Sequence, residues 1–245
     1  MSVFKFKQFE VNQDQCAMKI GTDSVLLGAW TSINNNPVTI LDIGSGTGIL
    51  ALMLAQRCPA ELIDAIEIDD DAFEQCIDNF EQSPWCDRLF CYHVSLDEFV
   101  DEIEDTHDLI ISNPPFYSPT LASPSLPKGE NVISDARKKA RFQNTLTFEQ
   151  LIEGVSKSLS NNGIFSVIIP FKEEENFIFL ASKISLFPNR ILHVKGNPTS
   201  ELKRSLLEFS FLKTAVEIKD LIIETERHQY TEEYINLTKD FYVKM

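Results

Sequence analysis

Apolar runs and helical patterns alternate along most of the chain. Short β-branched runs bounded by turn residues predict buried strands, and apolar positions at helical spacing predict amphipathic helices. The expected strands are residues 38–43, 62–68, 89–93, 108–112, 164–170, 190–195 and 206–212, the last two as an antiparallel pair. The expected helices are residues 24–30, 49–55, 69–80, 96–103, 147–159, 173–187 and 230–245, with Asn161, Asn162 and Gly163 ending the fifth. This alternation predicts a single doubly wound α/β domain over residues 1–245.

The first part of the chain has its own pattern. Three phenylalanines alternate loosely with polar residues over 4–9, which indicates a short strand or an extended arm. Farther on, Thr22 or Asp23 is expected to cap a helix that begins at Ser24, because a side-chain oxygen there accepts from a free backbone N–H.

A glycine-rich turn joins the strand over 38–43 to the helix after it. The turn reads Asp42-Ile43-Gly44-Ser45-Gly46-Thr47-Gly48, not the G-x-G-x-x-G of dinucleotide-binding folds. Asp42 would repel a pyrophosphate but attract an ammonium or a sulfonium. Glu67 ends the next strand, where such folds bind ribose hydroxyls. The favoured ligand is therefore a nucleoside with a positive tail, a description that S-adenosylmethionine fits; a turn that serves only packing is the alternative.

A stiff turn with few donors follows the strand over 108–112. It reads Ser112-Asn113-Pro114-Pro115-Phe116, and its prolines lack N–H groups and restrict the backbone. The turn presents two acceptors, the Asn113 side-chain oxygen and the Pro114 carbonyl, with the Phe116 ring behind them. Such a turn suits a planar group that carries an NH2. The alternative is a turn without a binding role, since Asn-Pro often marks one.

Charge gives an ambiguous indication of the partner. The formal net charge of −15 argues against a nucleic-acid binder, because phosphate contacts supply most of that affinity. Basic side chains that are candidates for an RNA footprint nevertheless cluster at Lys5, Lys7, Arg137, Lys138, Lys139 and Arg141. A solvated basic surface is the alternative. The long connection over 118–144 is expected to be functional or mobile.

Cysteine usage and apolar runs indicate the compartment. The five cysteines include no C-x-x-C pair, which favours reduced thiols and no metal site. No apolar run is long enough to cross a bilayer, and the first residues lack the apolar stretch of a secretory signal. We therefore expect a cytoplasmic protein that binds neither membrane nor metal, and a monomer is favoured.

Together these motifs resemble the class I S-adenosylmethionine-dependent methyltransferases with an Asn-Pro-Pro-aromatic turn. The resemblance implies a Rossmann-like sheet of seven mostly parallel strands with an antiparallel last strand. It implies that Gly44, Gly46 and Gly48 shape the cofactor loop and that Asp42 lies near the methionine ammonium. Glu67, with Ile68 beside it, would bind the ribose. Asn113, Pro114 and Phe116 would hold the substrate amine at the cofactor. Many relatives contact the cofactor adenine through an acid after the third strand; here Ser95 and Asp97 are both candidates.

A narrower resemblance covers nearly the whole chain. The stretches 4–9, 16–30, 82–85 and 136–141 look like those of the bacterial valine-tRNA adenine-N6 methyltransferases, which modify the adenine 3′ of the anticodon. The resemblance implies that residues 1–37 form an extension on the cofactor side and that Lys19, Gly21, Thr22 and Asp23 lie at the cofactor edge. The implied reaction is direct methyl transfer to the N6 of an adenine in tRNA, without a strong general base.

Three other functions remain open from the sequence. Protein-glutamine N5-methylation uses the same turn and suits an acidic enzyme, although such enzymes usually carry a helical N-terminal domain that the stretch before residue 38 has no room for. Guanine-N2 methylation of ribosomal RNA also uses such a turn, often followed by a histidine where this chain has Tyr117. A cofactor-binding regulator or assembly factor without turnover is the third, and the intact turn argues against it.

Overall fold

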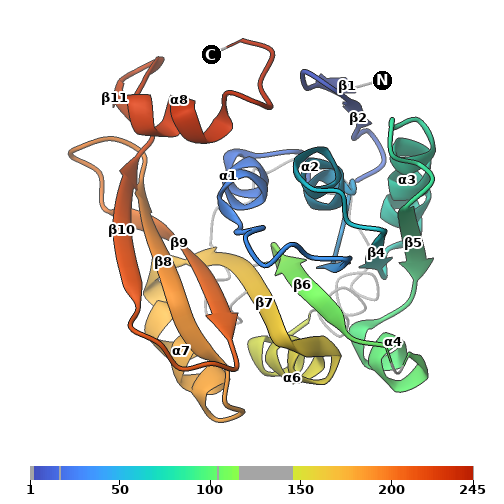
Figure 1. Cartoon of the computed structure of the whole chain (residues 1–245). Coiled ribbons are helices and arrows are strands. Elements are labelled where there is room, and N and C mark those ends of the chain that lie inside the picture. The colour runs from blue at the N-terminus through green and yellow to red at the C-terminus, as the bar shows by residue number, and fades with distance from the viewer. Residues whose placement is uncertain (1–2, 17, 104, 116–145, 245) are drawn as a thin grey trace, which may run out of the picture.

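An eight-stranded sheet separates two layers of helices (Figure 1). The computed structural model describes residues 3–16, 18–103, 105–115 and 146–244. The strands are β1 (Val3–Lys5), β2 (Glu10–Asn12), β3 (Thr39–Ile43), β4 (Leu62–Glu67), β5 (Leu89–His93), β6 (His107–Ser112), β7 (Leu159–Pro170), β8 (Phe187–Lys195), β9 (Leu202–Ser210), β10 (Glu217–Ile222), β11 (Glu224–Glu226) and β12 (Gln229–Tyr230). The helices are α1 (Thr22–Trp30), α2 (Ile49–Arg57), α3 (Asp70–Glu81), α4 (Leu96–Glu102), α6 (Phe148–Ser158), the short 3-10 helix η1 (Phe171–Glu173), α7 (Glu174–Ser182) and α8 (Glu232–Thr238).

The large sheet has the order β10-β8-β9-β7-β6-β3-β4-β5. β9 runs antiparallel to both of its neighbours, and the other neighbouring pairs are parallel. The predicted doubly wound α/β sheet, mostly parallel with an antiparallel last strand, is confirmed. The structure contains an eighth strand besides the seven expected ones. This strand, β10, pairs with β8 at the edge of the sheet. β10 is largely exposed and mixes charged with apolar residues, so it lacks the apolar run that marks the buried strands.

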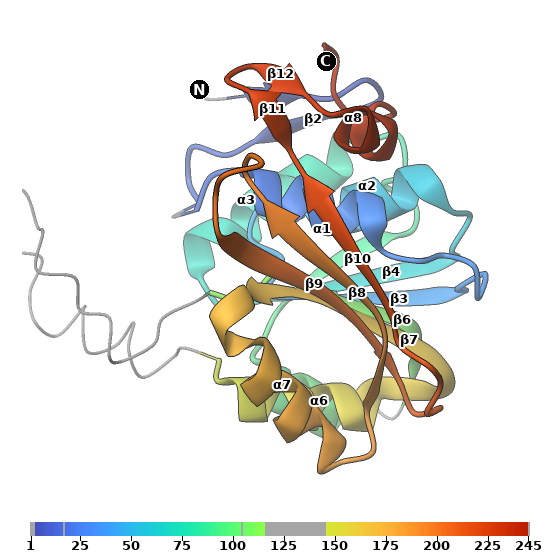
Figure 2. The same ribbon diagram turned by 90° about the vertical axis from the view of Figure 1, so that its left-hand side faces the viewer.

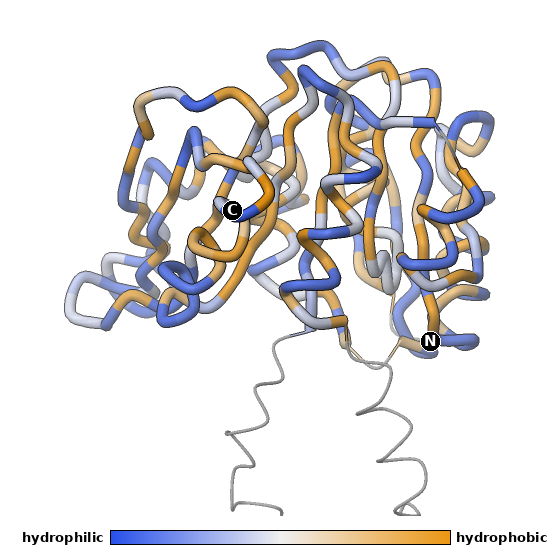
Figure 3. The backbone as a smooth tube through the Cα atoms, turned by 90° about the horizontal axis from the view of Figure 1, so that it is seen from below, coloured by the Kyte–Doolittle hydropathy of each residue, from blue (hydrophilic) through white to orange (hydrophobic). Residues whose placement is uncertain are grey.

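Alternating side chains of each central strand fill the two layers. On β3, Ile40 packs in the cluster that contains Leu26 of α1 and Leu52 of α2. The next residue, Leu41, packs in the cluster that contains Leu151 of α6. This is the two-residue period of a strand buried on both faces. Figures 1 and 2 show α1, α2 and α3 over one face and α4, α6 and α7 over the other. Figure 3 shows apolar and polar stretches alternating along the backbone.

The strand order reverses between β3 and β6. Ile43 of β3 pairs with Ser112 of β6, and the Ser112 hydroxyl donates to the Ile43 carbonyl at 2.8 Å. The next residues, Gly44 and Asn113, therefore leave the sheet side by side. Doubly wound folds bind ligands at this reversal, beyond the carboxyl ends of the strands. The fold thus brings the two turns singled out in the sequence together.

The N-terminal hairpin β1–β2 packs onto the domain. The Asn79 amide of α3 accepts from the Asn12 backbone N–H at 2.8 Å and donates to the Asn12 carbonyl at 2.9 Å. The Phe6 ring stacks on Tyr242 near the other end of the chain, with ring centroids 6.2 Å apart. Figure 1 shows both chain ends on the side of α1 and α2.

Several predicted boundaries are wrong. Gly21, not Thr22 or Asp23, is the N-cap of α1, and it offers no side-chain hydrogen bond. Asp23 instead pairs with Arg204 of β9 at 2.7 Å. Residues 161–163 lie inside β7, so they do not end the preceding helix.

Two predicted helices are shorter in the structure. The stretch over 173–187 contains α7 only as far as Ser182, because Ser185 adopts a positive φ of 63° that a helix does not allow and Phe187 begins β8. The tail over 230–245 contains α8, which Thr231 caps by accepting from the Tyr234 N–H. The predicted cap of α3 is confirmed, since the Asp69 side chain accepts from the Ala72 N–H at 3.1 Å.

Candidate active site

A cavity of about 410 Å³ opens where β3, β4, β5 and β6 end. Each strand end contributes to its lining: Gly44 and Gly46 after β3, Glu67 at the end of β4, Ser95 after β5, and Asn113 and Pro114 after β6. The glycine turn and the Asn-Pro-Pro turn therefore face one cavity. A ligand that fills this cavity touches both turns.

The three positions of the turn require glycine for different structural reasons. Gly44, Gly46 and Gly48 have φ values of 70°, 54° and 77°, a region that side chains disfavour. A Cβ at Gly44 or Gly46 would meet nothing within 4 Å, so the backbone there is open to the cavity. A Cβ at Gly48 would lie 2.5 Å from the Phe80 ring of α3. Gly48 lies outside the lining and lets α2 begin tightly against α3.

Asp42 is fully buried and is not among the lining residues. One carboxylate oxygen accepts from the Ala51 N–H in the first turn of α2 at 3.2 Å, because the N-cap Gly48 has no side chain to do so. The other oxygen has no hydrogen-bond partner in the described part of the chain. Burial raises the pKa of Asp42 to about 7, opposed by the Ala51 N–H and assisted by the negative charge of Glu67.

Glu67 ties the end of β4 to the glycine turn. One of its oxygens accepts from the Gly46 N–H at 2.8 Å. The other accepts from the N–H groups of Ile68 and Asp69 at 2.8 and 3.0 Å. A carboxylate oxygen has about two acceptor positions. The oxygen on Gly46 therefore keeps one position for a ligand hydroxyl, and Ile68 lines the cavity beside it.

The Asn113 amide has one end anchored and one end unpartnered. Its nitrogen donates to the Ser24 hydroxyl of α1 at 2.9 Å. Its oxygen is buried and accepts no hydrogen bond from the described residues. An unpaired buried acceptor costs about 1–3 kcal/mol, so native proteins rarely keep one without a use. The Asn113 oxygen is positioned to accept from a ligand donor, with Pro114 next to it in the lining.

Ser95 and Asp97 both line the cavity, but they differ in what they already bond. The Ser95 hydroxyl accepts from the Glu98 N–H at 3.3 Å and donates to the Glu98 carboxylate at 2.7 Å. The same carboxylate accepts from the Ser95 backbone N–H at 3.1 Å, which closes a capping box on α4. Within residues 3–16, 18–103, 105–115 and 146–244, no hydrogen bond or ion pair engages the Asp97 carboxylate. Asp97 is therefore the one of the two that is available to a ligand.

The four predicted residues of the N-terminal block lie outside this cavity. Lys19 is exposed, Gly21 and Thr22 line a second cavity, and Asp23 is paired with Arg204 as described above.

Cys16 and Met18, which the sequence did not single out, line the first cavity instead. Their signal in the sequence is the short apolar run over 16–18, which follows the polar residues 12–15. Burial, with the negative charges of Glu67 and Asp69, raises the pKa of Cys16 to about 12, so its thiol stays protonated.

The predicted RNA contacts are only partly described. Lys5 pairs with Glu10 at 2.7 Å, and the Lys7 ammonium donates to the Lys239 carbonyl at 2.6 Å; both lysines are exposed. Phe116, Arg137, Lys138, Lys139 and Arg141 lie outside the described residues.

The described residues contain no cluster of three or more His, Cys, Asp or Glu that suits a metal ion. None of their helices is long and apolar enough to cross a membrane.

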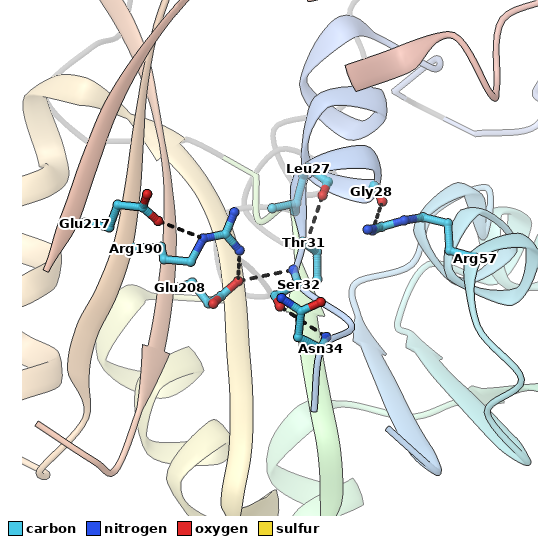
Figure 4. A network of polar contacts seen from close by, with 9 residues as sticks. All are labelled: Leu27, Gly28, Thr31, Ser32, Asn34, Arg57, Arg190, Glu208 and Glu217. Atoms are coloured by element: carbon cyan, nitrogen blue, oxygen red, sulfur yellow. Dashed lines mark hydrogen bonds and ion pairs between the residues drawn. The ribbon is translucent and has the colours of Figure 1, made fainter. Parts of the chain in front are cut away.

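Helix α1, which carries Ser24, is held at its carboxyl end by a polar network (Figure 4). The buried Glu208 carboxylate of β9 accepts from the Ser32 N–H at 3.2 Å and from Arg190 of β8 at 2.9 Å. Arg57 of α2 donates to the Gly28 carbonyl at 2.7 Å. These contacts fix α1 against the sheet and α2, and so they set the position of Ser24 relative to β6.

Comparisons with known proteins identify the family of this chain. Residues 20–147 match the model of the methyltransferase small domain family. A tRNA1(Val) (adenine(37)-N6)-methyltransferase from Flavobacterium psychrophilum is 59% identical over 99% of this chain and 100% of its own. A protein of the same name from Bacteroides fragilis is 43% identical over 99% of this chain and 98% of its own.

Solved structures show the same fold at low sequence identity. A predicted O-methyltransferase from Agrobacterium tumefaciens has a TM-score of 0.65 at 17% identity, over 89% of this chain and 96% of its own. The M. jannaschii protein TYW2, solved in complex with AdoMet, has a TM-score of 0.53 at 13% identity, over 85% of this chain and 84% of its own. The chain therefore belongs to the methyltransferase small domain family and, by its full-length relatives, to the tRNA1(Val) (adenine(37)-N6)-methyltransferase family.

Proposed function

We propose that this protein transfers a methyl group from S-adenosylmethionine to the exocyclic N6 of an adenine in tRNA. The observation that carries the proposal is the buried, unpartnered oxygen of Asn113 on the same cavity as the glycine turn and Glu67. An acceptor of this kind suits an NH2 donor, and an NH2 is the group that such an enzyme methylates.

The residues at the cavity fit the cofactor. Gly44 and Gly46 leave open backbone for it, and Glu67 keeps an acceptor position for a ribose hydroxyl. Asp97, with its free carboxylate, is our choice over Ser95 for the contact to the adenine. Asp42, buried behind the lining and with one unpaired oxygen, would lie near the methionine ammonium and attract it through its charge. When bound, S-adenosylmethionine supplies an electrophilic methyl group on a sulfonium.

The chain itself would activate the amine. The lone pair of an adenine NH2 is delocalised into the ring, so the nitrogen is a weak nucleophile. Hydrogen bonds from this NH2 to the Asn113 oxygen and the Pro114 carbonyl favour a pyramidal nitrogen with a localised lone pair. They also stabilise the positive charge that develops on the nitrogen, in a site that needs no reorganisation. The methylated nitrogen is acidic and then loses its proton without a strong base.

The relatives support a particular substrate. Full-length relatives named for adenine 37 of tRNA1(Val) favour that nucleotide over protein glutamine, guanine N2 or a non-catalytic role. The target base must leave its stack to reach the cavity, as for other enzymes that act on bases. The basic cluster over 137–141 and the exposed Lys5 and Lys7 remain our candidates for the phosphate contacts.

The same proposal covers the N-terminal extension, the cellular compartment and the oligomeric state. Residues 1–37 would form part of the cofactor side, which is supported by Cys16 and Met18 in the lining. We place the activity in the cytoplasm, in keeping with five free cysteines and a tRNA substrate, and we favour a monomer built as one domain over residues 1–245.

The test is methyl transfer from labelled S-adenosylmethionine to a tRNA1(Val) transcript, with mass analysis of the labelled nucleoside. We expect N6-methyladenosine at position 37 and no transfer when that adenine is replaced by guanine. Asn113→Ala should lower kcat by about 100-fold or more while leaving cofactor affinity nearly unchanged. Label that appears in protein extract or ribosomal RNA, and not in tRNA, would contradict the proposal.

A further inference from the structure

A second cavity, of about 330 Å³, lies between the two chain ends. The β1–β2 hairpin contributes Phe4, the start of α1 contributes Thr22, and the C-terminal part contributes Tyr230, Tyr234 and Tyr242. None of these residues has a part in the proposed methyl transfer. The cavity is therefore a second candidate binding site.

Its walls are unusually aromatic. The rings of Tyr230 and Tyr234 lie 5.2 Å apart, and those of Phe4 and Tyr242 lie 6.3 Å apart. Tyr234 is 3% exposed, whereas Tyr230 is 38% exposed, so Tyr230 presents a ring to solvent on a buried aromatic support. Such a ring is a stacking platform for a flat ligand.

The polar groups in the lining suit a nucleobase better than a phosphate. Glu224 brings a carboxylate that accepts hydrogen bonds and repels anions, and Lys244 brings an ammonium that donates them. The Tyr234 hydroxyl donates to the Tyr242 hydroxyl at 3.5 Å, and a phenol hydroxyl is able to donate and to accept. Mixed donors and acceptors around stacked rings match the edge and face of a base.

Topology puts this cavity on the same edge of the sheet as the first. β10 runs parallel to β8, and both are antiparallel to β9, which is antiparallel to β7. The carboxyl end of β10 therefore lies at the edge where β3 and β6 end, and Ile223 and Glu224 follow it into the second cavity.

One short segment separates the two cavities. Met18 lines the first, and Ile20 lines the second two residues later. At this boundary the Ile20 N–H donates to the Gln13 side-chain oxygen at 2.8 Å. An RNA strand that places one nucleotide in the first cavity would cross this segment. An adjacent nucleotide of the strand would then lie at the second cavity.

We infer that the second cavity binds an unstacked nucleobase of the RNA substrate, next to the nucleotide that is methylated, with Tyr230 as its stacking platform. The inference rests on the proposed function, since it takes the RNA from there. Aromatic stacking on a base is worth about 1–3 kcal/mol, which corresponds to roughly 5- to 150-fold in affinity.

The test compares steady-state kinetics and tRNA binding of Tyr230→Leu, Tyr230→Phe and the parent, with a tRNA1(Val) transcript as substrate. We expect Tyr230→Leu to raise KM and Kd for tRNA by about 10-fold with kcat and cofactor affinity unchanged, and Tyr230→Phe to behave like the parent. The matched control is Phe179→Leu, which removes a still more exposed ring on α7, a helix that covers the other face of the sheet. It should leave KM unchanged.

The outcomes separate this inference from the proposed function. If the parent methylates tRNA and Tyr230→Leu, with parent-like Tm, keeps the parent KM, the second cavity is not an RNA subsite while the proposed function stands. If Tyr230→Phe is as impaired as Tyr230→Leu, stacking is not the interaction. A parent that methylates no tRNA overturns both.

Discussion

The side-chain nitrogen of Asn113 donates to the Ser24 hydroxyl at 2.9 Å, which leaves the amide oxygen as the unpartnered buried acceptor. An amide turned the other way would present NH2 to the substrate NH2, and two donors cannot bond each other. Ser24 thus helps to decide whether the turn after β6 can hold an amine. Asp23, the residue before it, is tied to Arg204, so the start of α1 is fixed on the sheet.

We therefore predict that Ser24→Ala lowers kcat by about 2- to 10-fold, the value of one hydrogen bond that orients a reacting group. The cofactor Kd should stay close to that of the parent, because Ser24 does not line the cavity. Ser24→Thr, which keeps the hydroxyl, should recover most of kcat. Steady-state kinetics with equilibrium cofactor binding measure this. A Ser24→Ala enzyme with parent kcat would show that the amide is oriented by something else.

A second prediction separates Ser95 from Asp97. Asp97→Ala should weaken cofactor binding by about 10-fold, because hydrogen bonds to charged groups are the stronger ones. Ser95→Ala should instead lower the free energy of unfolding by about 1 kcal/mol, since its hydroxyl caps α4. Isothermal titration and thermal denaturation of the two variants give the comparison. The reverse pattern would assign the adenine contact to Ser95.

The sequence predicts the central sheet well because each buried strand carries a run of apolar residues, as in β3 and β6. It fails where tertiary contacts replace local signals. Gly21 caps α1 without a side chain, and β10 is a polar edge strand that only its pairing with β8 defines. Residues 161–163 are predicted as a turn, but they lie in β7 at the irregularity where its pairing with β6 shifts register between Leu159 and Ile164.

The site shows the same division. Gly44 and Asn113 directly follow strands and Glu67 ends one, so their convergence is predictable from the parallel sheet. Ser24 and Cys16 reach the cavity region only through the packing of the N-terminal segment and α1, which the order of the strand ends does not predict. Asp42 is in the predicted motif, yet it lies fully buried behind the lining because it replaces the missing cap of α2.

A third prediction concerns the proton on Asp42. Its pKa is raised to about 7 by burial, so the free protein carries a partly protonated carboxyl at neutral pH. A cofactor ammonium near Asp42 would favour the charged form and lower this pKa. Binding should then release up to about half a proton at pH 7, and affinity should rise with pH up to about 7 and level off above it.

Calorimetric titration of S-adenosylmethionine in buffers of different ionisation enthalpy measures this release. Asp42→Asn is the control, because it carries no titratable proton and should show neither the release nor the pH dependence. Equal proton release by Asp42→Asn and the parent would place the ammonium away from Asp42.

A fourth prediction tests the network that fixes α1. Burial raises the pKa of Glu208, and the charge of Arg190 opposes that rise. Arg190→Leu leaves the buried carboxylate with only the Ser32 N–H, and it should lower the free energy of unfolding by about 1–3 kcal/mol at neutral pH. Without Arg190, the pKa of Glu208 in the folded protein lies further above its value in the unfolded chain. The added destabilisation is therefore absent below pH 4.5, the usual pKa, and grows as the pH rises above that value. Denaturant unfolding from pH 4 to pH 8 would show this slope.

Two controls isolate the unpaired charge. The double variant Arg190→Leu with Glu208→Gln should recover much of the loss, because no buried charge remains unpaired. Lys157→Leu breaks an exposed pair with Asp101, separated by 3.7 Å, and should change the unfolding free energy by less than about 1 kcal/mol.

Since Glu208 holds Ser32 at the end of α1, Arg190→Leu should also lower kcat through the displaced Ser24. A variant that is destabilised but keeps parent kcat would show that α1 does not transmit this network to Asn113.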